Sequence, residues 1–184
     1  LRSQLGMAPG EHWLSILWPL VRSQLPSPPA RVVEIGCGRL GGFVPFLDSS
    51  GYDAVGVDPE APEGPDYRRI EFERLELPQR FDAAIASSSL HHVDDPGVVL
   101  DRLTSMMASG GTLVVVEWDW ERFDEATARW CFRRLGQDHD GNWLQRHRDR
   151  WADSGQEWES NLRAWATRER LHSGETLIQV LDER

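Results

Sequence analysis

The sequence contains no lysine: all 20 of its positively charged side chains are arginines. This absence excludes mechanisms that need a lysine, such as a Schiff base with a carbonyl substrate or the phosphate-binding lysine of a Walker-type loop. Basic charge is also in deficit, because 30 acidic residues give a formal net charge of -10. Nucleic-acid-binding domains usually carry an excess of basic charge, so we expect no nucleic acid and no anionic membrane as a partner.

Cysteines and long apolar runs are equally scarce. Cys37 and Cys131 form no CxxC pair and suggest no disulfide framework, which is typical of a reducing compartment. No apolar run approaches the length that crosses a bilayer, and the first ten residues do not have the pattern of a secretory signal. No HExxH or comparable spacing of metal ligands occurs. We therefore expect a cytoplasmic protein without a metal site.

The 184 residues suit a single domain in three parts. Residues 1–30 are predicted to form an N-terminal helical segment, because apolar residues recur at helical spacing over 11–25 and prolines follow. Residues 31–118 are predicted to form the core. Residues 119–184 contain no convincing strand and hold most of the nine tryptophans, so they are predicted to be a helical cap.

The core alternates short apolar strands with helices. Strands are predicted at 31–35, 53–57, 67–72, 81–86 and 112–118, and helices at 40–50 and 96–108. Continuous apolar strands separated by helices indicate a parallel sheet covered on both faces, and right-handed crossovers then give a doubly wound, Rossmann-like α/β fold. In the cap, four helices are predicted to begin near Asp124, Asn142, Trp158 and Ser173, the first of them ending at Gly136.

A glycine loop follows the first strand. Gly36-x-Gly38-x-x-Gly41 satisfies the dinucleotide-binding pattern, and Asp58 lies where a ribose-binding carboxylate belongs. Glycine is needed because a Cβ atom would block the close approach of backbone to ligand. The loop and the acid alone cannot distinguish a nicotinamide dinucleotide from another adenosine cofactor.

Three further features favour a cationic cofactor. Glu34 lies two residues before the first glycine, where a carboxylate suits an ammonium or sulfonium group but is unfavourable beside a pyrophosphate. The segment 81–96 reads FDAAIASSSLHHVDDP, and the segment 110–117 reads GGTLVVVE. Over residues 31–118 the sequence resembles the class I S-adenosylmethionine-dependent methyltransferases. The resemblance lies in four motifs that occur in the same order: E-x-G-x-G, G-V-D, F-D followed by L-H-H-V, and G-G-T-L.

The resemblance implies S-adenosylmethionine in the cleft and methyl transfer to a small-molecule acceptor. It places cofactor contacts at the methionine moiety (Glu34, Gly36, Cys37, Gly38), the ribose (Asp58), the adenine (Pro59, Glu73, Arg74) and the reacting methyl (Ser87, Ser88). Two departures from the family pattern occur. Leu40 stands where the third glycine is usual, and the two strands that normally finish the sheet are absent before Arg184, so we expect a C-terminally truncated sequence with an exposed edge strand.

Candidate catalytic bases lie after the fourth and fifth strands. His91, His92 and Glu117 could accept a proton from the acceptor, whereas the alternative is that the histidines anchor their loop and Glu117 forms a cap or pairs with an arginine of the cap region. Trp118, Trp120 and Trp18 are candidate contacts to the acceptor. Two other functions stay open: a nicotinamide-dependent oxidoreductase, and a regulatory protein that binds S-adenosylmethionine without turnover. The oligomeric state is not predicted.

Overall fold

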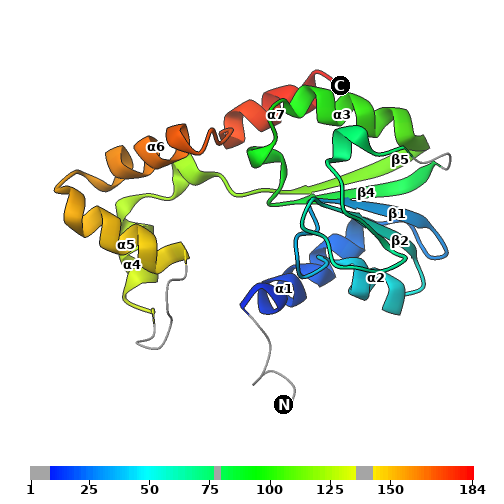
Figure 1. Ribbon diagram of the computed structural model, residues 1–184, viewed down its shortest axis with the longest axis horizontal. Coiled ribbons are helices and arrows are strands. Elements are labelled where there is room, and N and C mark those ends of the chain that lie inside the picture. Colours follow the sequence, from blue (N-terminus) through cyan, green and yellow to red (C-terminus); the bar gives the residue numbers. More distant parts are fainter. Residues whose placement is uncertain (1–8, 77–79, 136–142) are drawn as a thin grey trace, which may run out of the picture.

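The computed structural model describes residues 9–76, 80–135 and 143–184, and its centre is a five-stranded parallel sheet (Figure 1). The strand order is β3-β2-β1-β4-β5, and all pairs are parallel. The strands are β1 (Arg31–Ile35), β2 (Asp53–Val57), β3 (Tyr67–Arg68), β4 (Phe81–Ser87) and β5 (Met107–Val116). The direction of winding reverses at β1, so the crevice between the carboxyl ends of β1 and β4 is the expected ligand position. The predicted fold class is confirmed.

Two helical layers cover the sheet because neighbouring strand residues point to opposite faces. Val32 and Val33 are both fully buried, yet they belong to different apolar clusters. Val32 packs with α1 (Pro9–Gln24) and α2 (Val44–Ser49), while Val33 packs with α3 (Pro96–Met106) and α7 (Gly174–Asp182). Arg184 donates to Asp101 at 2.7 Å and thereby joins the end of α7 to α3.

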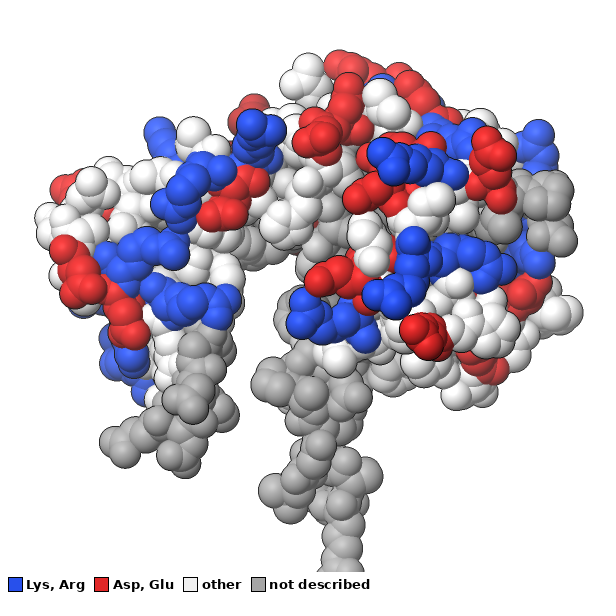
Figure 2. All heavy atoms as spheres, viewed as in Figure 1, with Lys and Arg blue, Asp and Glu red and all other residues white. Residues whose placement is uncertain are grey.

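The remaining helices form an arm that projects away from the sheet (Figure 1). They are the 3-10 helix η3 (Trp120–Arg122), α4 (Glu125–Phe132), α5 (Trp143–Ser154) and α6 (Trp158–Arg168). An aromatic cluster around the fully buried Trp158 holds the arm together. On the face shown in Figure 2, basic and acidic side chains are interspersed over the arm and the sheet alike. Within the described ranges, no helix is long and apolar enough to span a bilayer, and no cluster of ligand-type side chains could hold a metal ion.

Several predicted core elements differ in extent from the observed ones, and one of them is the strand predicted at 112–118, which runs from Met107 to Val116. The strand predicted at 67–72 ends at Arg68, and the 3-10 helix η1 (Phe72–Arg74) follows because Phe72 turns into the core beneath α3. The helix predicted at 40–50 begins only at Val44, since Gly41 and Gly42 adopt left-handed φ angles of 83° and 56°.

The helix predicted at 96–108 ends at Met106, and β5 begins at the next residue, ahead of the two glycines that were expected to close the helix.

The predicted start signals of the cap are confirmed where the structure describes them. Asp124 accepts a hydrogen bond from the backbone of Thr127 at 2.8 Å, and Ser173 accepts one from Thr176 at 3.2 Å. The helix predicted from Asp124 through Leu135 ends already at Phe132. Gly136 and Asn142, predicted to follow that helix and to begin the next, lie outside the described residues.

Candidate functional site

Two adjoining cavities open at the carboxyl ends of β1, β2 and β4. One, of about 400 Å³, is lined by the end of β2, by η1 and by the loop after β4. The other, of about 380 Å³, is lined by the glycine loop, the end of β4 and α1. Gly36 and Ser88 line both, so the two cavities meet at the crevice between β1 and β4. We call the pair the cleft.

The glycine loop is folded so that its backbone faces the cleft. Gly36 has φ 75° and donates to the carbonyl of Val57 at 2.8 Å, and a Cβ atom there would collide with Ser89. Gly38 has φ 62°, and a Cβ atom there would meet no other atom within 4 Å. The side of Gly38 that lacks a side chain is therefore open space, which is the geometry that a closely approaching ligand requires.

Glu34 lies inside the protein at the bottom of this loop. Its side chain is 1% exposed, and its carboxylate accepts a hydrogen bond from the backbone of Phe43 at 2.6 Å. Burial raises the pKa of Glu34 to about 8, in spite of opposing hydrogen bonds from Phe43 and Val44. Glu34, a predicted cofactor contact, lines the 380 Å³ cavity and also accepts a hydrogen bond from the turn into α2. Beside it, Cys37 is 5% exposed, and burial raises the pKa of its thiol to about 12.

Asp58 connects the end of β2 to the glycine loop. One carboxylate oxygen accepts from the backbone of Gly38 at 3.0 Å, and the other accepts from the backbone of Glu60 at 2.7 Å. Asp58, Pro59 and Glu73, all predicted cofactor contacts, line the 400 Å³ cavity. Arg74 is exposed and lines neither cavity, whereas Glu71 and Phe72 line the larger one and were not predicted.

Glu117 clamps the loop that follows β4. One of its carboxylate oxygens accepts from the backbones of Ser89 at 2.8 Å and Leu90 at 2.6 Å, and the other lies 2.5 Å from Nδ1 of His91. His91 is 5% exposed. Anchoring of the loop, the alternative role predicted for the histidines, therefore describes the contacts of His91. Glu117, for which the predicted alternative was a cap or a pair with an arginine of the cap region, binds this loop instead.

His92 is the predicted base that lines the cleft. It is exposed, lines the 400 Å³ cavity and stacks beside His91 with ring centroids 4.1 Å apart. Desolvation, together with the neighbouring His91, lowers the pKa of His92, so its imidazole is neutral and able to accept a proton at neutral pH.

The serines at the end of β4 also face the cleft. Ser88 adopts φ 52°, which is uncommon outside glycine, and its backbone donates to Val116 at 2.8 Å. Ser87 and Ser88 line the 380 Å³ cavity. The hydroxyl of Ser89 is buried and has no hydrogen-bond partner in the described part of the chain, so it is available to a ligand in the adjoining cavity.

The three predicted acceptor-binding tryptophans pack elsewhere. Trp18 stacks with Phe43 and Phe46 between α1 and α2, with ring centroids 6.1 Å and 5.7 Å apart. Trp118 and Trp120 belong to the aromatic cluster of the arm. None of the three lines the cleft, so the geometry does not support a contact with the acceptor.

The tryptophan that reaches the cleft is Trp13. It lines the 380 Å³ cavity together with Leu14, because the first turns of α1 lie over the glycine loop. Helical periodicity placed both residues on α1 but could not show which part of α1 approaches the loop.

His172 is a connecting residue that the sequence did not reveal. Its Nε2 donates to the carbonyl of Val93 at 2.9 Å, and its backbone donates to the carbonyl of His91 at 3.0 Å. The carbonyl of His172 accepts from the indole of Trp120 at 3.2 Å. These bonds tie the base of the arm to the loop that lines the cleft. No local motif marks such a residue, since its partners Val93 and His91 lie 79 and 81 positions away.

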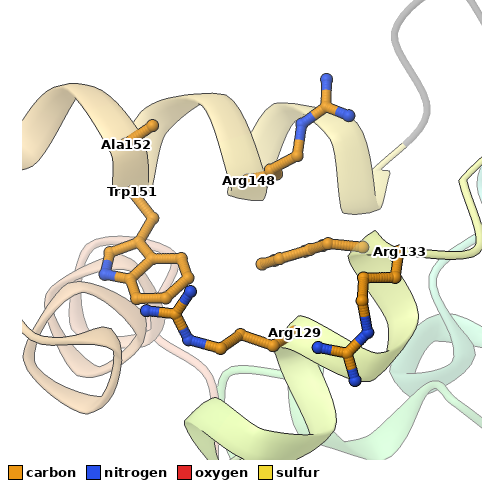
Figure 3. Close-up of a pocket in the computed structure, with 6 residues that line it drawn as sticks. Arg129, Arg133, Arg148, Trp151 and Ala152 are labelled. Carbon is orange, nitrogen blue, oxygen red and sulfur yellow. The ribbon is translucent and has the colours of Figure 1, made fainter.

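A separate cavity of about 560 Å³ lies within the arm between α4 and α5 (Figure 3). Arg129 reaches over the ring of Trp151 at 4.7 Å and is also paired with Glu125 at 2.6 Å. In Figure 3 the guanidinium of Arg148 points away from Arg129 and Arg133. The three cations therefore do not converge on one point.

Residues 12–184 match the model of a family described as a methyltransferase domain. The chain belongs to this family. The ubiquinone biosynthesis O-methyltransferase of Bradyrhizobium sp. (strain ORS 278) is 29% identical over 136 residues, which is 66% of this chain and 51% of that protein. The protein of the same description from Azorhizobium caulinodans is 30% identical over 145 residues, 71% of this chain and 54% of that protein. The chain spans about half the length of the curated relatives it matches.

Solved structures show the same fold. The PH0226 protein of Pyrococcus horikoshii OT3 aligns with a TM-score of 0.55 and 19% identity over 65% of this chain and 63% of that one. A putative methyltransferase from an antibiotic biosynthesis pathway of Anabaena variabilis aligns with a TM-score of 0.52 and 22% identity over 82% of this chain and 55% of that one. The family assignment confirms the resemblance found in the sequence, and the comparisons give the nicotinamide alternative no support.

Proposed function

We propose that this chain binds S-adenosylmethionine in the cleft and transfers its methyl group to a hydroxyl group of a small-molecule acceptor. The observation that carries the proposal is the open backbone of Gly38 held by Asp58 at the crevice between β1 and β4. The bound cofactor supplies an activated methyl group. The chain therefore has to position the two reactants, and orientation alone lowers such barriers by roughly 7–11 kcal/mol.

Side chains at both ends of the cleft have the chemistry to contact parts of this cofactor. Asp58 is partly exposed at the larger cavity, where its carboxylate can accept hydrogen bonds from ribose hydroxyls. Pro59 and Phe72 give that cavity an apolar wall for a flat base, and the free hydroxyl of Ser89 offers a polar contact. Glu34 lies at the other end, where a bound ammonium would favour its ionised form.

A hydroxyl acceptor is supported by the relatives, which are described as O-methyltransferases. Transfer to a hydroxyl oxygen needs a base, and His92 is the candidate whose side chain faces the cleft and has a lowered pKa. Glu117 and His91 then act as positioning residues. A cytoplasmic location and the lack of a nucleic-acid partner stay predictions from composition.

Calorimetric titration with S-adenosylhomocysteine tests cofactor binding. We expect saturable binding, at least tenfold weaker in Asp58→Ala. The matched control is Asp53→Ala, because Asp53 lies at the opposite end of the same strand in an exposed ion pair with Arg31. Binding of NAD but not of S-adenosylhomocysteine contradicts the proposal, and so does an unchanged dissociation constant in Asp58→Ala.

A separate assay tests His92. Transfer of a labelled methyl group to a panel of phenols and catechols should fall about 10²–10⁴-fold in His92→Ala, while the affinity for S-adenosylhomocysteine stays within a few-fold of the parent protein. Full activity in His92→Ala would exclude His92 as the base.

A further inference from the structure

Helix α1 carries more apolar surface than its packing on the sheet uses. Leu14, Leu17, Trp18 and Val21 pack in the apolar cluster beneath the sheet. A second set of side chains is exposed: Trp13 at 51%, Ile16 at 58% and Leu20 at 58%. Intervals of three and four residues place Trp13, Ile16 and Leu20 along one side of the helix. We call these three residues the α1 stripe.

The α1 stripe begins at the cleft. Trp13 lines the 380 Å³ cavity, and Leu40, which is 52% exposed, lines it from the glycine loop. Single exposed apolar residues are ordinary, whereas a contiguous group marks a binding surface. Of the seven large apolar side chains that are strongly exposed in the described ranges, four belong to the stripe or to Leu40, and the other three are dispersed over α3, α4 and α7.

The charge around the α1 stripe and its exposed area indicate what kind of molecule binds there. Residues 13–21 contain no charged side chain, and the chain as a whole has a net charge of -10, so an anionic lipid surface gains no attraction here. The exposed stripe offers on the order of 300 Å², which is well below the roughly 800 Å² per partner of a stable protein interface. An apolar tail of a small molecule fits both observations.

We propose that the methyl acceptor is amphiphilic, with its polar head in the cleft and an apolar tail lying along Trp13, Ile16 and Leu20. This inference rests on the proposed function, because the cleft must hold the cofactor for the head to be methylated. From Trp13 to Leu20 the helix rises about 10 Å, which corresponds to an alkyl tail of about eight carbons. Longer tails pass the end of the stripe and gain nothing more.

The test uses 4-alkylcatechols with tails of one to twelve carbons, titrated calorimetrically into the protein saturated with S-adenosylhomocysteine. Each added methylene should tighten binding about threefold to fourfold up to about eight carbons, followed by a plateau. In Ile16→Ser and Leu20→Ser the octyl compound should bind at least tenfold more weakly, with the methyl compound unchanged. Ile178→Ser on α7 is the matched control, since Ile178 is 61% exposed and lines neither cavity of the cleft.

Several results would overturn the inference. One is binding that does not depend on tail length, and another is an equal loss of affinity for the octyl compound in Ile178→Ser. A third is a dimer that Leu20→Ser converts to a monomer in sedimentation, because a second copy of the chain would then cover the stripe. Retained S-adenosylhomocysteine binding in every variant shows that the cofactor site is intact. If that compound does not bind at all, the proposed function fails, and the same alkyl series titrated without it still tests the stripe.

Discussion

The substitution Glu117→Ala tests whether Glu117 holds the loop after β4 in place at the cleft. Glu117→Ala removes the acceptors of two backbone N–H groups, at 2.8 Å and 2.6 Å, and the partner of the His91 imidazole. Hydrogen bonds to charged groups contribute about 1.5–3 kcal/mol each, and water that enters the vacated space recovers part of that loss. We therefore expect the free energy of unfolding to fall by about 4 kcal/mol. For a chain of this size that lowers the melting temperature by roughly 8–16 °C.

Two measurements distinguish a clamp from a catalytic base. Thermal unfolding gives the stability, and calorimetry gives the affinity for S-adenosylhomocysteine, which should weaken at least tenfold in Glu117→Ala because the loop after β4 lines the cleft. Glu117→Gln retains an oxygen for both backbone groups and should lose only about 1 kcal/mol. Glu121→Ala, an exposed acid four residues later, is the control. Unchanged stability and affinity in Glu117→Ala, together with lost methyl transfer, would refute the clamp.

Three further predictions concern ionisation. Because burial raises the pKa of Glu34 to about 8, binding of the cationic S-adenosylmethionine at pH 7 should release up to one proton, and binding enthalpies that are equal in phosphate and Tris buffers would contradict this. His147 is 2% exposed. Its burial, and to a smaller extent the positive charge of Arg150, lowers its pKa from 6.5 to about 4, so the folded state disfavours the protonated imidazole. The stability that neutral His147 contributes should fall by up to about 3 kcal/mol between pH 6.5 and pH 4, so in denaturant titrations the free energy of unfolding of the parent relative to that of His147→Phe should fall by that amount over this range. Iodoacetamide at pH 7.5 should modify Cys131 long before Cys37, whose thiol has a pKa of about 12, and mass spectrometry after short reaction times decides this.

The elements that determine the fold could be predicted because their signals are local. Val32 and Val33 are both apolar, and so are the strands on either side, because a parallel strand is buried on two faces. The distance from Gly38 to Asp58 is set by one strand–helix–strand unit, so the hydrogen bond between them follows from spacing along the chain. The crevice at the carboxyl ends of these strands could be located in this way from the sequence.

The roles of the polar and aromatic side chains depended on contacts between distant segments. Glu117 and His172 act through partners 26–28 and 79 positions away, and no pattern within one element encodes such pairs. A tryptophan contributes the same apolar surface to a core or to a cleft. Only the packing of α1 over the glycine loop decided that Trp13, and not Trp118, lines the cleft. Local periodicity thus determined the sheet and its glycine loop, while tertiary contacts decided which side chains are free to face a ligand.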